Sequence, residues 1–235
     1  METHGRATFK DVTAWPGGAL GIGMDGRVLR YPGIWGAPWN RALPMTVRAV
    51  AASARAVWVV GENGILQRLD GGRANAARTY PQSAAWSIDG LTVSDDDRAF
   101  LLVGGRWKEL RDNGELVDTA CGPSRSGAAS SQRLYVVGTD GQLSVTTPDG
   151  RCVPFDTGGR AVVSVTAYRE QLAIVDTGGR AFLYRGGLWH ALPDPFIYRE
   201  DRFPHRTSIR KLATSQLALW ALDSEGQVFV LSEDP

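Results

Sequence analysis

A short hairpin pattern recurs along the whole chain and limits what the chain can fold into. Its clearest copy is Leu217–Leu231, LALWALDSEGQVFVL, in which two runs of strand-forming residues flank a turn. Both faces of the first run are apolar, which is typical of a strand buried between two layers. Gly226 supplies the positive φ that such a turn requires. The segment therefore predicts two short antiparallel strands.

Further copies align on their turn glycines. They are Ala19–Leu29, Val57–Leu66, Leu134–Leu143 and Leu172–Leu183, with a weaker copy at Ala99–Val103 that is shorter before its glycine. An apolar triplet such as Val165-Thr166-Ala167 precedes most copies, and a fourth element such as Trp189–Pro193 follows several. One unit is thus a sheet of four short strands, which cannot bury both of its faces alone.

Stacking such units around an axis buries both faces of every sheet. Trp58, Tyr135 and Trp220 share one position of the repeat and are expected to form the core between neighbouring units rather than a ligand site. Six copies average about 39 residues each, a period typical of propeller blades. We therefore predict an all-β fold, a six-bladed β-propeller of four-stranded blades in one domain, residues 1–235. The expected blades lie near residues 9–46, 47–87, 88–124, 125–161, 162–207 and 208–235, the last one completed by residues 1–9. The small polar stretch Cys121–Gln132 is predicted to be a loop.

The last copy ends without room for a fourth strand, because only Ser232–Pro235 follow Leu231. A ring with two open sheet edges invites aggregation. We therefore expect residues Gly5–Lys10 to pair as the outer strand of the final blade, so that the N-terminal strand closes the ring.

Charge and composition narrow the function. A net charge of +1 gives no electrostatic reason to expect nucleic-acid binding. No apolar run approaches the length of about 20 residues that a membrane span needs, and no signal peptide is visible, so a cytoplasmic location is expected. In that compartment Cys121 and Cys152 are interpreted as free thiols, with a disulfide between them as the alternative.

No catalytic or metal-ligating set is apparent. Asp-Thr-Gly occurs at Asp156 and at Asp176, as in aspartic proteases, but Asp and Gly are standard turn residues and a turn is the better interpretation. Asp95–Asp97 lacks the spacing of a calcium loop, and the three histidines are isolated. We predict a protein that is not an enzyme and has no metal ion or cofactor.

The candidate contact residues are aromatic, arginine and histidine side chains outside the repeat. Pro193–Ser208 is an insertion relative to the other copies, and long excursions from a regular scaffold are often functional. Exposed aromatic side chains next to arginines are common binding anchors. The candidate partner-binding residues are Trp35, Trp39, Trp189, Phe196, Tyr198, Arg199, Arg202, Phe203 and His205.

The hairpin motif resembles the tectonin repeat. The match rests on Val57–Leu66, Leu134–Leu143 and Leu217–Leu231, each an aromatic residue and two apolar residues before a turn glycine. Tectonin-type propellers include tachylectin and the fish-egg lectins, so the resemblance implies a propeller fold and a capacity to bind glycans or lipopolysaccharide between blades. Those lectins are secreted and contain disulfides, which this chain is not expected to share.

The sequence thus leaves two functions open. The first is a non-enzymatic binding propeller that docks a macromolecular partner, with a protein expected, through a ring face and the Pro193–Ser208 loop. The alternative is a tectonin-like lectin.

Overall fold

The computed structural model describes residues 8–15, 18–31, 40–53, 55–70, 77–94, 96–130, 133–192, 196–198, 204–206, 208–214 and 218–231. All structural statements concern these residues. They form strands and one 3-10 helix, η2 (Pro81–Ala85). The described part of the chain holds no helix of the length and apolar character that crossing a membrane requires.

Antiparallel sheets of consecutive strands make up the fold. One continuous sheet contains β1 (Phe9–Trp15), β2 (Gly18–Gly23), β3 (Arg27–Tyr31), β4 (Asn40–Ala52), β5 (Ala56–Gly61), β6 (Leu66–Asp70) and β7 (Ala77–Tyr80). Three four-stranded sheets follow. The first contains β8 (Ile88–Val93), β9 (Ala99–Val103), β10 (Arg106–Leu110) and β11 (Leu116–Asp118), and the second contains β12 (Ser124–Ser130), β13 (Arg133–Gly138), β14 (Leu143–Thr146) and β15 (Cys152–Pro154). The third contains β16 (Val162–Tyr168), β17 (Gln171–Asp176), β18 (Ala181–Arg185) and β19 (Leu188–Ala191). A two-stranded sheet, β20 (Phe196–Tyr198) and β21 (Pro204–Arg206), precedes a three-stranded one, β22 (Ile209–Thr214), β23 (Leu219–Asp223) and β24 (Val228–Leu231).

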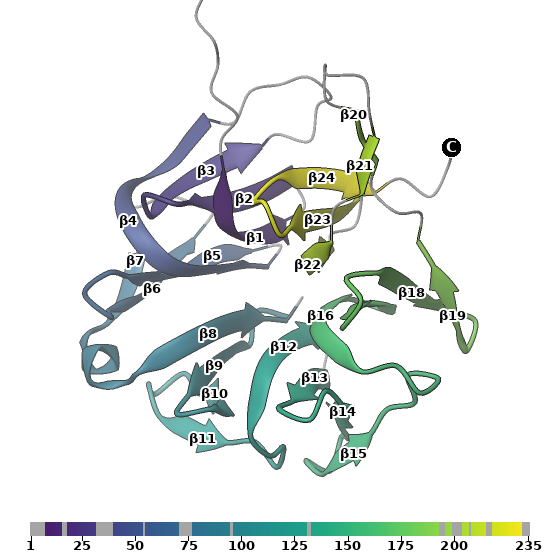
Figure 1. The fold of residues 1–235 in the computed structure, drawn as a ribbon. Helices are drawn as coiled ribbons and strands as arrows, with labels where there is room; N and C mark the ends of the chain where they lie inside the picture. Colours follow the sequence, from purple (N-terminus) through teal and green to yellow (C-terminus); the bar gives the residue numbers. More distant parts are fainter. Residues whose placement is uncertain are drawn as a thin grey trace, which may run out of the picture.

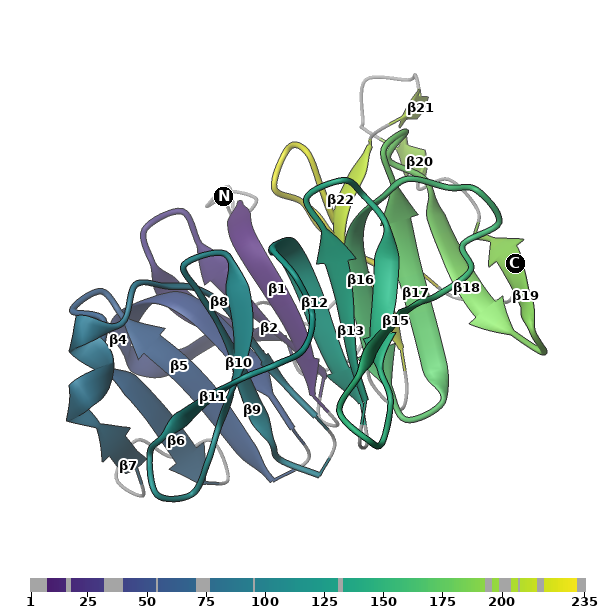
Figure 2. The same cartoon turned by 90° about the horizontal axis from the view of Figure 1, so that it is seen from below.

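The sheets are arranged as a propeller. Figure 1 looks along the axis and shows β1, β8, β12, β16 and β22 near the centre, with later strands of each sheet further out. Figure 2 shows the sheets standing side by side with the twist expected of antiparallel strands. The predicted all-β propeller is confirmed.

The sheets differ from the expected set of separate four-stranded blades. β4 is the reason for one difference: its first half pairs with β3 and its second half, from Val47 onward, pairs with β5. No loop interrupts it, so the expected boundary at residues 46 and 47 lies inside a strand, and two repeats merge into one sheet. The last sheet has three strands among the described residues.

The first strand of every repeat carries the same irregularity. A register shift, which marks a β-bulge, occurs near the start of β1, β8, β12, β16 and β22, and at the start of the second half of β4, where each pairs with the next strand. A bulge bends the strand and increases its twist. The weak third copy is regular in this respect, and its missing residue is explained by the tight Gly104-Gly105 turn, where both residues have positive φ.

The last sheet closes onto the first. Phe9 N donates to Gly226 O over 2.8 Å, which reproduces the bonds Val47 N to Gly26 O and Val162 N to Gly141 O between other neighbours. Arg210 Nη2 also donates to Phe9 O over 2.9 Å. The predicted pairing of Gly5–Lys10 with the final sheet needs correction: Phe9 starts β1, which pairs with β2, and its apolar side chain is buried between the first and last sheets. Residues 5–7 lie outside the described residues.

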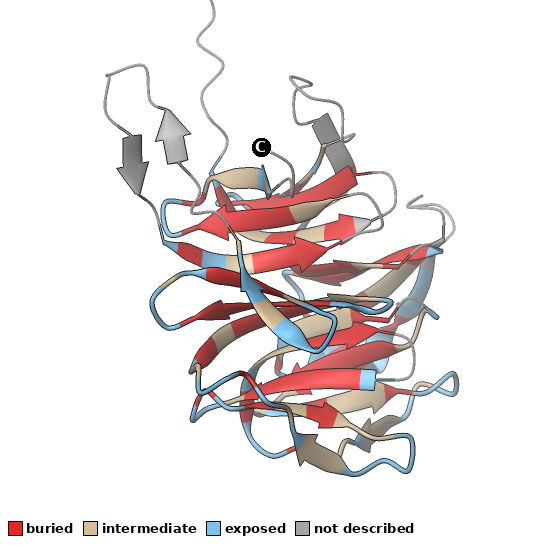
Figure 3. Ribbon diagram, turned by 90° about the vertical axis from the view of Figure 1, so that its right-hand side faces the viewer, coloured by how far each residue is buried: buried red, intermediate tan, exposed pale blue. Residues whose placement is uncertain are grey.

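The core consists of apolar layers between neighbouring sheets. One layer joins Trp58 to Leu101 across β5 and β9, and another joins Tyr135 to Ile174 across β13 and β17. The layer that contains Phe9, Val12 and Trp220 lies between the first and last sheets. Figure 3 shows that burial follows the strands, whereas the turns are exposed. The prediction that Trp58, Tyr135 and Trp220 form inter-blade core is confirmed.

The prediction of a loop over Cys121–Gln132 is wrong for its central part, which forms β12. Glycine, alanine and serine disfavour a strand by propensity, but the first strand of this unit lies near the crowded axis, where small side chains fit. Ala128 and Ala129 are buried, and the Trp107 indole lies over Gly127. Packing therefore overrides local propensity here.

Gly127→Ala is expected to lower the free energy of unfolding by about 1–3 kcal/mol, because the added methyl overpacks the core. Its carbon would lie 2.6 Å from Trp107 Cε2. Urea unfolding followed by tryptophan fluorescence measures the effect. Gly122→Ala is the matched control, since its methyl meets nothing within 4 Å and should change stability by less than about 0.5 kcal/mol. Equal effects of the two variants would contradict the assigned packing.

Cys121 and Cys152 form a disulfide, with the sulfur atoms 2.01 Å apart. The interpretation as free thiols is therefore wrong, and the alternative holds. Cys121 follows β11 and Cys152 begins β15, so the bond connects the outer parts of two neighbouring sheets. The error came from the expected cytoplasmic compartment, in which disulfides are rare.

Candidate functional site

The structure places few of the predicted contact residues. Trp35, Trp39, Arg199, Arg202 and Phe203 lie outside the described residues. Phe196, Tyr198 and His205 are placed only as backbone positions in the β20–β21 hairpin, where Ile197 pairs with His205. Trp189 in β19 is fully described.

Trp189 belongs to an aromatic cluster at the outer side of two sheets. Its ring lies 5.0 Å from Tyr184 and 6.2 Å from Phe155, measured between centroids. Phe155 in turn meets Tyr135 edge-on at 5.9 Å. The indole Nε1 donates to Asp156 O over 2.9 Å, which fixes Trp189 against the neighbouring sheet. Trp189 is therefore packed against the Tyr184 and Phe155 rings.

A cleft opens beside this cluster, and we call it the 4/5 cleft because it lies between the β12–β15 and β16–β19 sheets of the fourth and fifth repeats. Its volume is about 600 Å³, within the range typical of ligand pockets. Three rings form its apolar wall, and charged side chains from the β12–β13 and β16–β17 turns border it. The lining residues are Ser130, Arg133, Tyr135, Pro148, Phe155, Arg169, Glu170, Leu172 and Tyr184.

A filled counterpart of this cleft lies between the second and third repeats. Asp97, from the β8–β9 turn, extends its carboxylate toward the preceding sheet. Its Oδ1 accepts hydrogen bonds from Ser53 Oγ at 2.7 Å and Trp58 Nε1 at 3.1 Å. Its Oδ2 accepts from Arg68 Nε at 3.0 Å and Nη2 at 2.6 Å. We call this arrangement the Asp97 clamp.

The Asp97 clamp is mostly buried and continues into stacked rings. Only 11% of the Asp97 side chain is exposed. The Trp58 ring stacks on Tyr80 at 5.9 Å, and burial raises the pKa of the Tyr80 phenol. Asp97 adopts a φ of 73°, a left-handed conformation that aspartate tolerates better than most residues. A carboxylate is therefore held by an indole N–H, a guanidinium and a hydroxyl beside aromatic surface.

Strand pairing shows that the Asp97 clamp and the 4/5 cleft lie at equivalent positions of their repeats. Trp58 pairs with Ala51 on the first strand of its sheet, and Tyr135 pairs with Ala128 on its own. Ser53 and Ser130 end or follow those first strands. Ser130 Oγ donates to the backbone O of Arg169. Arg169 has a positive φ of 53°, and Asp97 has one of 73°.

The clamp and the cleft differ in the length of the turn that the next repeat supplies. The β16–β17 turn has only Arg169 and Glu170 between the paired residues Tyr168 and Gln171, whereas Asp95–Asp97 separate Ser94 from Arg98, whose backbone groups bond to each other. The shorter turn brings no aspartate into the 4/5 cleft. Both Arg133 and Arg169 are exposed at its border, and with Glu170 they leave one net positive charge.

A second cleft of about 440 Å³ lies between the third and fourth repeats. It is lined mainly by polar and charged residues, and these are already paired: Glu109 accepts from Arg98 at 2.7 Å and from Arg111 at 3.2 Å. A hydrogen bond from Lys108 and its positive charge lower the pKa of the Asp118 carboxyl. Pro148 borders both clefts.

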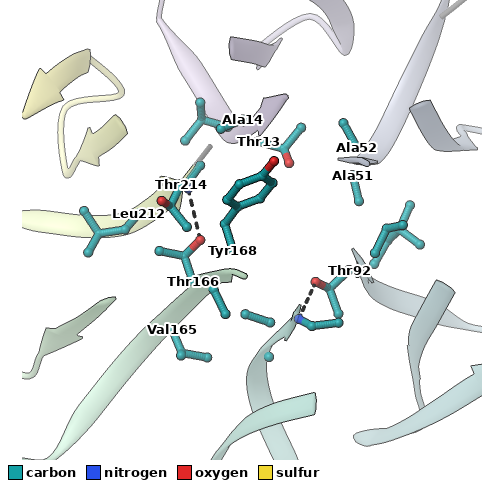
Figure 4. A pocket seen from close by; sticks show the side chains of 18 of the residues that line it. Thr13, Ala14, Ala51, Ala52, Thr92, Val165, Thr166, Tyr168, Leu212 and Thr214 are labelled. Carbon is teal, nitrogen blue, oxygen red and sulfur yellow. Dashed lines mark hydrogen bonds between the residues drawn. The ribbon is translucent and has the colours of Figure 1, made fainter. Parts of the chain in front are cut away.

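The centre of the ring is narrow. The channel between the first strands has a volume of about 70 Å³ and is lined by alanine, valine, leucine and threonine side chains. Figure 4 shows the Tyr168 ring across its centre, with the hydroxyl toward Thr13. Thr92 Oγ1 and Thr166 Oγ1 accept backbone N–H groups of the following sheet, from Ala129 and Thr214, each at 3.2 Å. These channel hydroxyls thus join neighbouring sheets.

The Asp-Thr-Gly motifs are turns, as interpreted from the sequence. Asp176 Oδ1 accepts from the backbone N of Arg180, and Asp156 Oδ1 accepts from that of Gly158. Within the described segments, no group of three histidine, cysteine or acidic side chains could hold a metal ion.

The sequence did not identify the 4/5 cleft. Tyr135 was recognisable as a repeat position, but Phe155, Tyr184, Arg133 and Arg169 come from separate strands and turns. The one available signal was the length of the β16–β17 turn, which is shorter than the β8–β9 turn in the same position of the repeat.

Comparisons with known proteins bear on the fold. Neither a protein-family model nor the sequence of a curated protein matches the chain. Among solved structures, YCF48 bound to a D1 peptide matches with a TM-score of 0.57 at 15% identity, over 98% of this chain and 80% of that one. Human WBSCR16 matches with a TM-score of 0.57 at 10% identity, over 98% and 77% of the two chains.

A third similar structure is Prp20p from Saccharomyces cerevisiae, described with its binding to Gsp1p and histones. It matches with a TM-score of 0.55 at 12% identity, over 87% of this chain and 66% of that one. At these identities the similarities show a common propeller fold.

Proposed function

We propose that this chain is a non-enzymatic propeller that binds a protein partner. The observation that carries the proposal is the 4/5 cleft: aromatic rings and arginines gather in a pocket-sized hollow on a rigid scaffold. Aromatic and arginine side chains are the residues most enriched at the energetic centres of protein interfaces. Support comes from two proteins of similar fold, YCF48, whose structure holds a bound D1 peptide, and Prp20p, which is described with its binding to Gsp1p and histones.

The contact surface in this proposal is the ring face that carries the turns between first and second strands. Arg133, Arg169 and Pro148 all belong to turns or turn borders on that face. The Pro193–Ser208 segment is proposed as an additional contact, since it interrupts the repeat just before β22.

Site-specific photo-crosslinking in the native host tests the proposal. A photoreactive residue in place of Arg133 is expected to capture one dominant protein. The same residue in place of Asp140, an exposed position in the β13–β14 turn on the opposite face, should not capture it. Equal capture from both positions, or none from Arg133, would argue against this surface.

We further propose that the ring consists of six repeats, with β4 shared between two of them. This count is supported by the bulge that recurs in the first strand of each repeat and by the bond from Phe9 to Gly226 between the last sheet and the first. The tectonin-like lectin role stays a prediction, and a glycan array tests it.

The cytoplasmic location also stays a prediction. The Cys121–Cys152 bond favours a different proposal, an oxidising compartment, because structural disulfides rarely persist in a reducing cytosol.

A further inference from the structure

We propose that the 4/5 cleft binds the carboxylate of an aspartate or glutamate in an extended, partly apolar segment of the partner. The inference rests on the proposed protein-binding function and specifies the chemistry of the segment that is bound. It comes from the Asp97 clamp, where the chain itself supplies such a carboxylate to the equivalent place.

In the clamp, the carboxylate lies where the edge of a repeat aromatic, a serine and an arginine converge. It is bonded to Ser53, Trp58 and Arg68. The 4/5 cleft offers related groups: the Tyr135 ring and two arginines from neighbouring turns, while the Ser130 hydroxyl donates to the backbone O of Arg169. What it lacks is the acid, because the shortened β16–β17 turn does not extend into it.

The charges at the cleft favour an acidic ligand. Arg133 lies two residues before Tyr135 on β13, so both side chains project from the same face of the strand. Arg169 approaches from the next sheet, with its guanidinium carbon 5.4 Å from the Tyr168 ring centroid. Glu170 alone opposes these two positive charges among the lining residues. An incoming carboxylate would meet forked donors, which arginine presents in pairs.

The rest of the cleft determines what surrounds the acid. Phe155 and Tyr184 lie 5.1 Å apart edge to face and offer an apolar wall. Pro148 closes the outer end. Such a surface suits one or two apolar side chains next to the acidic residue, and the cleft's volume of about 600 Å³ accommodates a few residues of extended peptide.

The second, polar cleft is a poorer candidate for this ligand. Its arginines Arg98 and Arg111 already bond to Glu109, so a new carboxylate would have to displace an internal one. At the 4/5 cleft no such internal ion pair has to be broken at Arg133 or Arg169 among the described interactions.

The test is a selection followed by matched measurements. A phage library of random twelve-residue peptides is selected on the disulfide-intact protein. An enriched peptide is then synthesised with both ends capped. Control peptides replace each acidic residue by its amide, glutamine for glutamate and asparagine for aspartate. We expect enrichment of aspartate or glutamate beside aromatic or aliphatic residues. Replacing one acidic residue by its amide should weaken binding by about tenfold or more, as measured by calorimetry.

Variants then locate the site. Arg133→Glu with Arg169→Glu should abolish binding of the acidic peptide, whereas Arg133→Lys with Arg169→Lys should retain part of it. Arg27→Glu with Arg106→Glu is the matched control: both residues are exposed on the opposite face, the change in net charge is the same, and binding should persist. Circular dichroism and the melting temperature establish that each variant is folded.

Several results would overturn the inference: no enriched peptide, equal binding of acid and amide versions, equal loss in the control pair, or occupation of the cleft by a glycan instead. A partner captured at Arg133 whose binding does not depend on any carboxylate would leave the proposed function intact while removing this inference. A selected acidic peptide without capture of a partner in the host would support carboxylate binding at the cleft while removing the proposed function.

Discussion

Asp97→Ala is expected to lower the free energy of unfolding by about 3 kcal/mol. The substitution leaves Arg68 without the carboxylate that accepts two of its N–H groups, and Trp58 Nε1 and Ser53 Oγ lose their acceptor as well. Breaking a largely buried ion pair from one side costs more than the pair contributes, because the remaining charge loses the carboxylate that was desolvated with it.

The measurement is urea unfolding at neutral pH, supported by a melting curve. For a chain of 235 residues, a loss of this size corresponds to a decrease in melting temperature of roughly 6–12 °C. Since Trp58 stacks on Tyr80 and faces the β8–β9 turn, its fluorescence should also report the loss of the clamp.

Two control variants separate the carboxylate from the backbone. Asn tolerates the left-handed conformation at position 97 and keeps an acceptor oxygen, so Asp97→Asn should cost less than alanine. Asp97→Gly removes any strain at φ 73° together with the side chain, so it should remain nearly as damaging as alanine. If glycine instead restored stability, backbone conformation and not the ionic contacts would explain the effect.

The double variant Arg68→Ala with Asp97→Ala measures the coupling. Removing both partners should cost less than the sum of the single substitutions, because the interaction between the two side chains is then lost only once. Additive losses would show that the two side chains act independently.

The predictable part of this fold was the part that repeats. Turn glycines such as Gly141 and Gly226, each with positive φ, recur with the apolar strands around them, and a repeated sheet with two apolar faces has few stable arrangements other than a ring. The same reasoning placed Trp58 and Tyr135 in the core between sheets. Such features depend on local pattern and are visible without knowing which sheets meet.

The unpredictable part depended on contacts between sheets. Gly127 and its neighbours were predicted to be a loop, because their composition does not show that Trp107 from the preceding sheet covers Gly127. The 4/5 cleft likewise depends on what the next repeat supplies: Asp97 enters one junction, and no acid enters the other. A single-residue difference in turn length decides between a filled and an open site, and propensity carries no information on that choice.

The largest error concerned the cysteines, because their state was inferred from an expected compartment and not from geometry. Breaking the bond with Cys121→Ala and Cys152→Ala is expected to lower the free energy of unfolding by about 3.5 kcal/mol. The two residues are 31 positions apart, and in the chain-entropy model a loop of that length gives this value by constraining the unfolded chain. The melting temperature should decrease by roughly 7–14 °C.

The single variants distinguish a disulfide from two cysteine side chains that act independently. Each one breaks the bond completely, so Cys121→Ala, Cys152→Ala and the double variant should lose similar stability, and wild type treated with a phosphine reductant should match them. Substitutions of two unlinked side chains would instead add. Intact-protein mass should also increase on reduction by the mass of two hydrogen atoms. Additive losses in the single variants, or thiols that react in the native oxidised protein, would contradict the disulfide.

The disulfide has a consequence at the candidate binding surface that can be measured independently. Cys152 begins β15, which leads directly to Phe155 in the wall of the 4/5 cleft, while Cys121 follows the Thr119–Ala120 border of the polar cleft. The bond therefore links the segment that follows β11 to the β14–β15 hairpin, which carries Pro148. Loss of the bond should increase hydrogen exchange first at Val153 and Val145, which pair in β14 and β15, and leave β5 and β6 unchanged. Uniformly faster exchange over all sheets would instead mean that the bond stabilises the ring globally and not this rim.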